Sequence, residues 1–125
     1  MDTRSKILTG DAARALPRPL TVVTGYFDVL RAEHARELEN IRRRSGCRTL
    51  LALVLPFPGE VFDIRARARM VAALRVVDYV LVADAREPDA LLEALRPQTA
   101  IRMEADDVRR NGEIAERIRR GQGRQ

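Results

Sequence analysis

The stretch LTVVTGYFDVLRAEHARELENIRR, residues 20–43, decides the fold of this chain. It opens with an apolar, β-branched run at 20–24, which predicts a strand that ends at Gly25. A helical pattern follows from residue 32 to residue 44, and Ser45-Gly46 predicts the end of that helix. A strand, a tight turn and a long helix in this order indicate an α/β unit.

The rest of the chain repeats this alternation of strand and helix. Near-continuous apolar runs predict strands that are buried on both faces, as in parallel sheets. The predicted strands lie at 48–55, 78–83 and 99–103, and the predicted helices at 63–74, 88–95 and 112–120. We therefore predict a Rossmann-like three-layer α/β/α sandwich with a parallel sheet. Ligands of such sheets bind beyond the carboxyl ends of the strands, which directs attention to the turn after residue 24.

Composition limits the domain count and the class of protein. The 125 residues suit a single domain over 1–125, with 1–19 as an N-terminal extension and 121–125 as a tail. One cysteine excludes an internal disulfide and a thiolate-rich zinc site, and we expect no metal site. Without a signal peptide or a long apolar span, the expected location is the cytoplasm, away from membranes. The net charge of +5 comes with few aromatic residues and no reader motif, so nucleic acid is not the expected partner.

Three segments together resemble the nucleotidyltransferase superfamily with an HxGH motif, also called cytidylyltransferase-like. The first reads TVVTGYFDVLRAEHARELE, residues 21–39, where the family has VVFTNGCFDLLHxGHxxYL. The others are RARMVAALRVVDYVLV at 67–82 and LLEALRPQTAIR at 91–102, similar to the family's R-x-VDxV and ALRPDxLVKGGD stretches. The likeness covers about residues 20–120, and it is greatest to the adenylyltransferase domain of ADP-heptose synthases and to glycerol-3-phosphate cytidylyltransferases.

The resemblance implies a fold detail, a reaction and an assembly. The four predicted strands would be ordered 3-2-1-4, with the family's fifth strand lost or reduced. Members join a nucleoside triphosphate to a phosphorylated sugar or polyol and release pyrophosphate, and an active member uses a Mg-nucleotide. The resemblance also implies a homodimer joined at RVVDY, residues 75–79, and the unpaired edge expected at TAIRM, residues 99–103, is the alternative interface.

Around the first turn the family motif is degenerate, because RAEH replaces HxGH. Phe27 and Asp28 match the family turn, and His34, the only histidine, matches the second motif histidine. Arg31 stands in the place of the first histidine, so a cation is retained near the expected phosphate. Glu33 replaces the family glycine, which takes up space and adds a charge that repels a triphosphate. We predict that Arg31 and His34 project toward one cleft, because residues three apart share a helix face.

Further arginines match family positions elsewhere in the chain. Arg67 and Arg75 match arginines around the second helix, and Arg102 stands where the family has the lysine of KGGD. The resemblance therefore gives Arg31 and His34 the catalytic positions, and it gives Phe27, Asp28, Arg67, Arg75 and Arg102 the nucleotide-binding positions. In RARAR, residues 65–69, Arg65 and Arg69 lie one helical turn apart, and one of them is a candidate for the pocket lining.

Two functions from different classes stay open at this point. In the first, the domain is catalytically degenerate and serves as a nucleotide- or protein-binding module without a cofactor of its own. In the second, it is a divergent active nucleotidyltransferase in which Arg31 replaces the lost histidine and the nucleotide brings Mg²⁺. The substitutions at Arg31 and Glu33 affect the same pocket and favour the first, so catalysis is uncertain on the sequence.

Overall fold

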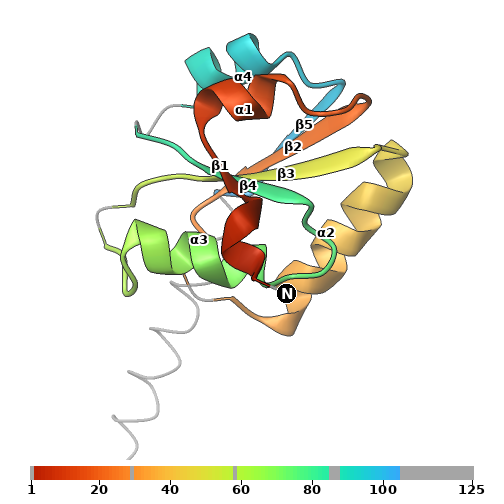
Figure 1. Ribbon diagram of the computed structural model, residues 1–125. Helices are drawn as coiled ribbons and strands as arrows, with labels where there is room; N and C mark the ends of the chain where they lie inside the picture. The colour runs from red at the N-terminus through yellow and green to blue at the C-terminus, as the bar shows by residue number, and fades with distance from the viewer. Residues whose placement is uncertain (1, 29, 58, 85–87, 105–125) are drawn as a thin grey trace, which may run out of the picture.

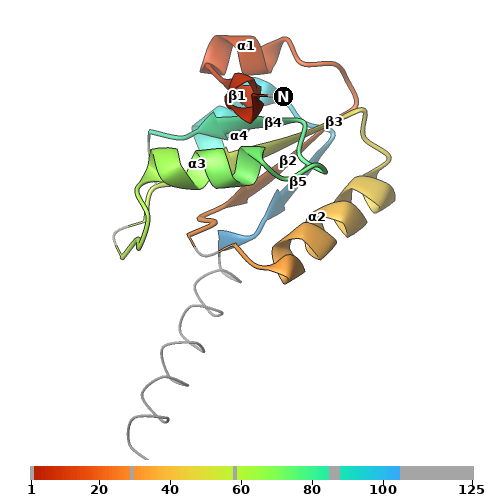
Figure 2. The same cartoon turned by 60° about the horizontal axis from the view of Figure 1, so that its bottom comes forward.

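A computed structural model describes residues 2–28, 30–57, 59–84 and 88–104 of the chain. Its centre is a parallel five-stranded sheet in the order β1-β4-β3-β2-β5 (Figure 1). The strands are β1 (Ile7–Leu8), β2 (Leu20–Gly25), β3 (Thr49–Val54), β4 (Tyr79–Val82) and β5 (Thr99–Arg102). The helices are η1 (Thr3–Lys6, 3-10), α1 (Gly10–Arg14), α2 (Ala32–Ser45), α3 (Ile64–Ala72) and α4 (Asp89–Leu95). Helices α2 and α3 cover one face of the sheet and α1 and α4 cover the other (Figure 2).

The predicted fold class is confirmed, and the strand order differs in one detail. The four predicted strands are β2, β3, β4 and β5, and their order β4-β3-β2-β5 is the predicted 3-2-1-4. The sheet nevertheless has a fifth strand, because β1 pairs in parallel with the outer side of β4. This strand comes from the segment that we treated as an N-terminal extension. The stretch where the family's fifth strand was expected and the helix predicted at 112–120 lie outside the described residues.

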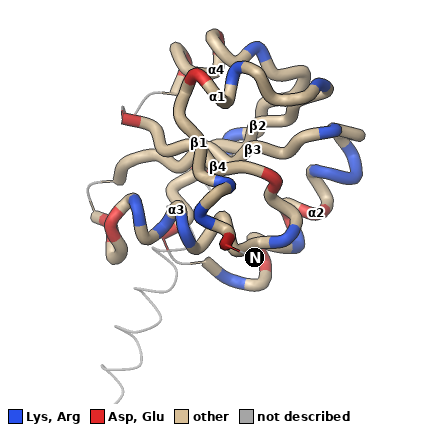
Figure 3. Tube along the Cα trace, in the orientation of Figure 1, with Lys and Arg blue, Asp and Glu red and all other residues tan. Residues whose placement is uncertain are grey.

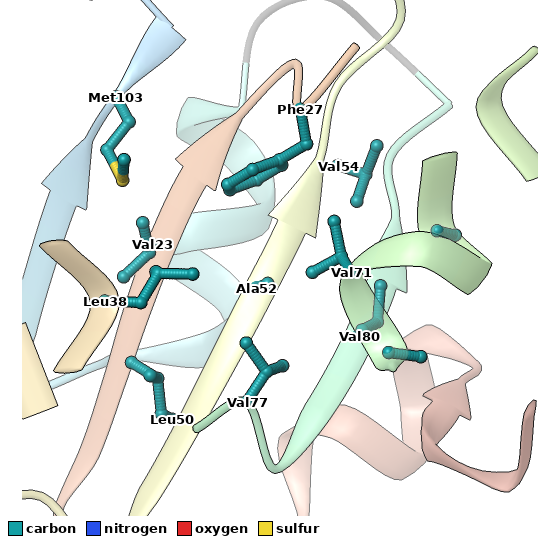
Figure 4. Close-up of a cluster of buried hydrophobic side chains, with 12 residues drawn as sticks. Val23, Phe27, Leu38, Leu50, Ala52, Val54, Val71, Val77, Val80 and Met103 are labelled. Atoms are coloured by element: carbon teal, nitrogen blue, oxygen red, sulfur yellow. The ribbon is translucent and has the colours of Figure 1, made fainter. Parts of the chain in front are cut away.

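Burial of the two central strands explains their apolar sequences. Every residue of β2 and β3 is buried, because both strands have neighbours on each side and helices on each face. Side chains alternate between the faces, so one cluster with Val23 and Ala52 packs against α2 and α3. Figure 4 shows this cluster, with Phe27 and Met103 at its upper end. The opposite cluster, with Val22 and Leu53, packs beneath α1 and α4.

The end of α2 agrees with the sequence prediction. Gly46 caps the helix with a φ of 62°, a left-handed conformation that glycine adopts without strain. Its N–H donates to the carbonyl of Arg42 at 3.2 Å. Because α2 runs antiparallel to β2, its first turn lies at the carboxyl end of the sheet, beside the turn that follows β2.

The N-terminal segment covers part of one surface that was predicted to form a dimer. Lys6 Nζ donates to the carbonyls of Leu74 and Val77, at 3.2 Å and 2.9 Å. Val77 is completely buried, so a charged substitution there would disrupt the core and would not test an interface. The homodimer stays a prediction. None of the helices in the described segments has the length and apolar character that crossing a membrane requires.

Candidate functional site at the carboxyl end of the sheet

The turn after β2 is held by the buried carboxylate of Asp28. Asp28 Oδ1 accepts hydrogen bonds from the backbone N–H groups of Val61 at 2.9 Å and Phe62 at 3.0 Å. Its Oδ2 accepts from Val61 at 2.8 Å. Phe27, just before it, is fully buried and has a φ of 51°, which a bulky residue adopts only when its surroundings impose it. The turn is thus fixed by core packing of Phe27 and by the loop between β3 and α3.

The side chain of Arg67 stabilises the same turn through hydrogen bonds. Its side chain is completely buried, and Nη1 donates to the carbonyls of Tyr26 at 2.6 Å and Leu55 at 2.8 Å. Nε donates to the carbonyl of Phe62 at 3.1 Å, and Nη2 pairs with the carboxylate of Glu60. One guanidinium therefore joins the end of β2, the end of β3 and the loop before α3. These contacts give Arg67 a structural role at the position where the resemblance implies nucleotide binding.

His34 stabilises the start of α2. It is 2% exposed, and its Nδ1 accepts a hydrogen bond from the backbone N–H of Arg31 at 3.1 Å. The backbone N–H of His34 donates in return to the carbonyl of Arg31 at 3.0 Å. Nδ1 must be unprotonated to accept, so a neutral imidazole carries its proton on Nε2. The ring of Phe27 lies 6.2 Å from the imidazole, measured between centroids.

Arg31 is the N-cap residue of α2, and part of its guanidinium has no hydrogen-bond partner among the described residues. Its Nε and Nη2 are buried, and no described residue accepts from either nitrogen. A buried N–H without an acceptor costs about 1–3 kcal/mol, and more when the group is charged. This unsatisfied cation lies at the start of a 14-residue helix, where backbone N–H groups and the helix dipole also favour an anion.

Arg102 lies at the carboxyl end of β5 and belongs to a network of polar side chains. Its Nε donates to Glu104 at 2.7 Å, and its Nη1 lies 3.4 Å from the carboxylate of Asp89 at the start of α4. The other oxygen of Glu104 accepts from the hydroxyl of Thr24 at 2.6 Å. Glu104 and buried Met103 thus occupy the positions where the family has two glycines.

The structure brings most of the predicted site residues to one end of the sheet and separates one from them. Phe27, Asp28, Arg31, His34, Arg67 and Arg102 follow, or lie beside, the carboxyl ends of strands. Arg75 precedes β4 and is exposed, so it lies at the amino end of the sheet, away from this group. Glu33 is exposed in the first turn of α2.

Sequence reasoning missed the carboxylates that neutralise two of the arginines. Glu60 pairs with Arg67 and Glu104 pairs with Arg102. Arg102 is the last residue of β5 and Glu104 follows two residues later, a short separation that could have indicated their pair. Glu60 gives no comparable signal, because it reaches Arg67 from an irregular loop.

Comparisons with known proteins agree with the resemblance. No family model matches the chain. The chain is 29% identical over 110 residues to the bifunctional protein HldE of Alcanivorax borkumensis and 34% identical over 109 residues to that of Koribacter versatilis. These matches cover 82% and 80% of this chain but only 23% and 22% of the relatives, so the chain spans less than a quarter of their length.

A solved structure supports the fold. The lipopolysaccharide core biosynthesis protein from Thermoplasma volcanium superposes with a TM-score of 0.58 at 19% identity, covering 65% of this chain and 70% of that one. At this identity the superposition shows a shared fold alone. Together with the HldE matches and the Phe27-Asp28 turn ahead of the RAEH motif, it places this chain in the cytidylyltransferase-like nucleotidyltransferase superfamily.

Proposed function

We propose that this nucleotidyltransferase-like module binds the phosphate group of a nucleotide at the start of α2 and does not transfer it. The observation that carries the proposal is that Nε and Nη2 of the half-buried Arg31 are buried and have no acceptor among the described residues. A phosphate oxygen is the acceptor that best satisfies a planar pair of guanidinium N–H groups. It would also face the N-terminus of α2, where the helix dipole adds favourable charge.

The state of the RAEH motif argues against transfer. Transfer of a nucleotidyl group depends on positioned cations that stabilise charge as it develops on the phosphate. The Nδ1 of His34 is engaged in the cap of α2, so the imidazole could contact a substrate only through Nε2. Glu33 adds a carboxylate in the same turn of the helix. These changes would weaken catalysis more than binding, because binding needs only one contact to the anion. Catalysis needs all the cations that stabilise charge on the phosphate.

A magnesium ion would enter this site with the nucleotide and would be held through its phosphates. In the part of the chain that the structure describes, no group of three or more His, Cys, Asp or Glu side chains is placed to hold a metal. Carboxylates and water usually supply only part of a Mg²⁺ shell, and substrate phosphates supply the rest. The residues present therefore fit a Mg-nucleotide better than a resident metal ion.

The proposal is tested by calorimetric titration of the full chain with CTP and with ATP, each with magnesium. We expect weak binding, with a Kd of roughly 0.1–1 mM, because one arginine carries most of the interaction. The Arg31→Met variant should bind about tenfold more weakly, which corresponds to about 1.4 kcal/mol. Arg75→Met is the matched control, because it removes the same charge at the opposite end of the sheet. Equal losses of nucleotide affinity in the two variants would show that binding depends only on net charge and would overturn the proposal.

Two substitutions of Glu33 separate its charge from its volume. Glu33→Gln should raise triphosphate affinity several-fold by removing repulsion at short range. Glu33→Gly should raise it further if the side chain also blocks the approach of the nucleotide to the backbone. If neither variant gains affinity, the restriction lies elsewhere, and Met103-Glu104 is the next candidate.

A pyrophosphate-release assay decides between binding and catalysis. With CTP or ATP and a series of phosphorylated sugars and polyols, we expect no release above the background without protein. Steady release that Arg31→Met abolishes would instead support a divergent active nucleotidyltransferase. In that case Arg31 would stabilise the phosphate in place of the lost histidine.

A further inference from the structure

A cavity beside α3, the α3 cavity, is lined by none of the residues of the site at the β2–α2 turn. It is open to solvent and is lined by α3, the N-terminal segment and the end of β4, which lies two strands away from β2 in the sheet. Its volume is about 610 Å³, within the range of roughly 300–1,000 Å³ that is typical of small-molecule sites. Its floor is apolar and is formed by Ile7, Ile64, Ala68 and Val82.

Two arginines line the same cavity as this apolar floor. Arg65 and Arg69 lie one turn apart on α3, both are exposed, and both line the cavity. Among the described residues, neither side chain has a hydrogen-bond or ion-pair partner. Figure 3 shows basic residues on α3 and on the adjoining N-terminal segment. The cavity thus combines a hydrophobic surface with two uncompensated guanidinium groups.

The other charged residues of the cavity indicate where in it an anionic group would bind. Arg4 also lines it, but its guanidinium is already engaged by Asp2, through hydrogen bonds of 3.1 Å and 3.2 Å. These bonds hold the pKa of the Asp2 carboxyl below its usual value. Among the described residues of the lining, Asp84, which follows β4, is the acidic one and repels an anion. An anionic group is therefore best placed beside α3, away from the end of β4.

We propose that the α3 cavity binds a small amphipathic anion, with its apolar body on the floor and its carboxylate or phosphate head between Arg65 and Arg69. The two ends of such a ligand match the two surfaces of the cavity. A purely apolar molecule would leave both arginines unpaired, and a small inorganic anion would leave the floor exposed to water. The arginine fork binds carboxylates and phosphates alike, so the head group has to be identified by experiment.

Calorimetric titration of the full chain with decyl phosphate and with decanoate, both below the concentration at which they form micelles, tests the proposal. We expect saturable binding of one molecule per chain, and the tighter of the two identifies the head group. Decan-1-ol lacks the charge and inorganic phosphate lacks the apolar body, so each should bind at least tenfold more weakly than the preferred amphiphile. Equal binding of decan-1-ol would overturn the role of the arginines, and equal binding of inorganic phosphate would overturn the role of the floor.

A pair of matched double variants locates the head group. Arg65→Ser with Arg69→Ser should weaken binding about tenfold or more. Arg36→Ser with Arg43→Ser removes the same charge from exposed positions on α2 and should leave binding unchanged. All four side chains are exposed, so both double variants are expected to fold. Equal weakening in the two proteins, or saturable binding by neither the phosphate nor the carboxylate amphiphile, would contradict the proposal.

The Arg31→Met variant keeps this inference separate from the proposed nucleotide site. It should lose affinity for CTP or ATP and retain full affinity for the preferred amphiphile. Loss of both ligands in this one variant would show that the amphiphile occupies the turn after β2, and the assignment to the α3 cavity would then fail.

Discussion

Two arginine side chains at the same end of the sheet differ in their surroundings. The guanidinium of Arg67 donates to three backbone carbonyls and to the carboxylate of Glu60. In Arg31, by contrast, Nε and Nη2 are buried and have no acceptor among the described residues. The donors of Arg67 are thus satisfied within the described chain, whereas two donors of Arg31 are not.

This difference separates a structural arginine from a candidate ligand-binding arginine. A buried cation stabilises a fold only when hydrogen bonds replace the water that it loses. Arg67 meets this condition within the chain. No described residue meets it for Arg31, which is the property expected of a phosphate-binding group. The two arginines therefore differ in their hydrogen-bond acceptors. Substitutions at the two positions should change the free energy of unfolding in opposite directions.

The largest expected effect is on Arg67. Arg67→Met should lower the free energy of unfolding by about 3–5 kcal/mol, because it removes a buried charge and leaves its acceptors unpaired. Urea denaturation followed by circular dichroism measures this change. Arg65→Met, two residues away and exposed, is the control and should stay within about 0.5 kcal/mol of the wild type. A loss below about 1 kcal/mol for Arg67→Met would contradict its structural role.

Asp28 should come second, because it fixes the same loop with fewer groups. Asp28→Ala should cost about 2–3 kcal/mol, since the N–H groups of Val61 and Phe62 lose a charged acceptor. Asp28→Asn keeps Oδ1, which accepts from both N–H groups, and should cost only about 1 kcal/mol. The same denaturation experiment compares the two. If Asn is as damaging as Ala, the negative charge matters more than the hydrogen bonds.

The sequence patterns that predicted the fold are of two kinds: apolar runs that mark buried strands, and short local signals that mark the end of a helix. The apolar runs at 20–24 and 48–55 predicted β2 and β3, and Ser45-Gly46 predicted the end of α2. Strand β1 was missed for a physical reason, because Ile7-Leu8 is too short to show a period and is a strand only through its pairing with β4. The sheet order of the other strands followed from the family resemblance.

The site was predictable in position and less so in detail. The resemblance placed Phe27, Asp28 and Arg31 at the turn after β2, which is where the structure has them. It could not show that Arg67 is used internally, because most of its acceptors are backbone carbonyls, which every residue carries. Arg75 lies at the other end of the sheet because it precedes β4, and its place just before the strand predicted at 78–83 was a signal that could have shown this.

His34 tests the start of α2 with a smaller effect. His34→Leu retains much of the buried volume and removes the acceptor for the backbone N–H of Arg31, so it should cost about 1–2 kcal/mol. His34→Asn places an amide oxygen near the position of Nδ1 and should recover most of this loss. Equal unfolding free energies for the two variants would show that the cap contributes little. The imidazole would then be available for another role.

Arg31 gives the smallest change in stability and the sharpest contrast. Arg31→Met keeps an unbranched apolar side chain and removes the unsatisfied donors, so the variant should be as stable as the wild type or more stable by up to about 1–2 kcal/mol. Addition of Mg-nucleotide should shift this comparison toward the wild type by about 1 kcal/mol, because at ten times the wild-type Kd it stabilises the wild type by about 1.4 kcal/mol and a variant that binds tenfold more weakly by only about 0.4 kcal/mol. Urea denaturation of both proteins with and without nucleotide measures the four values. If Arg31→Met unfolds as easily as Arg67→Met, then Arg31 has an internal partner and the two arginines have the same function.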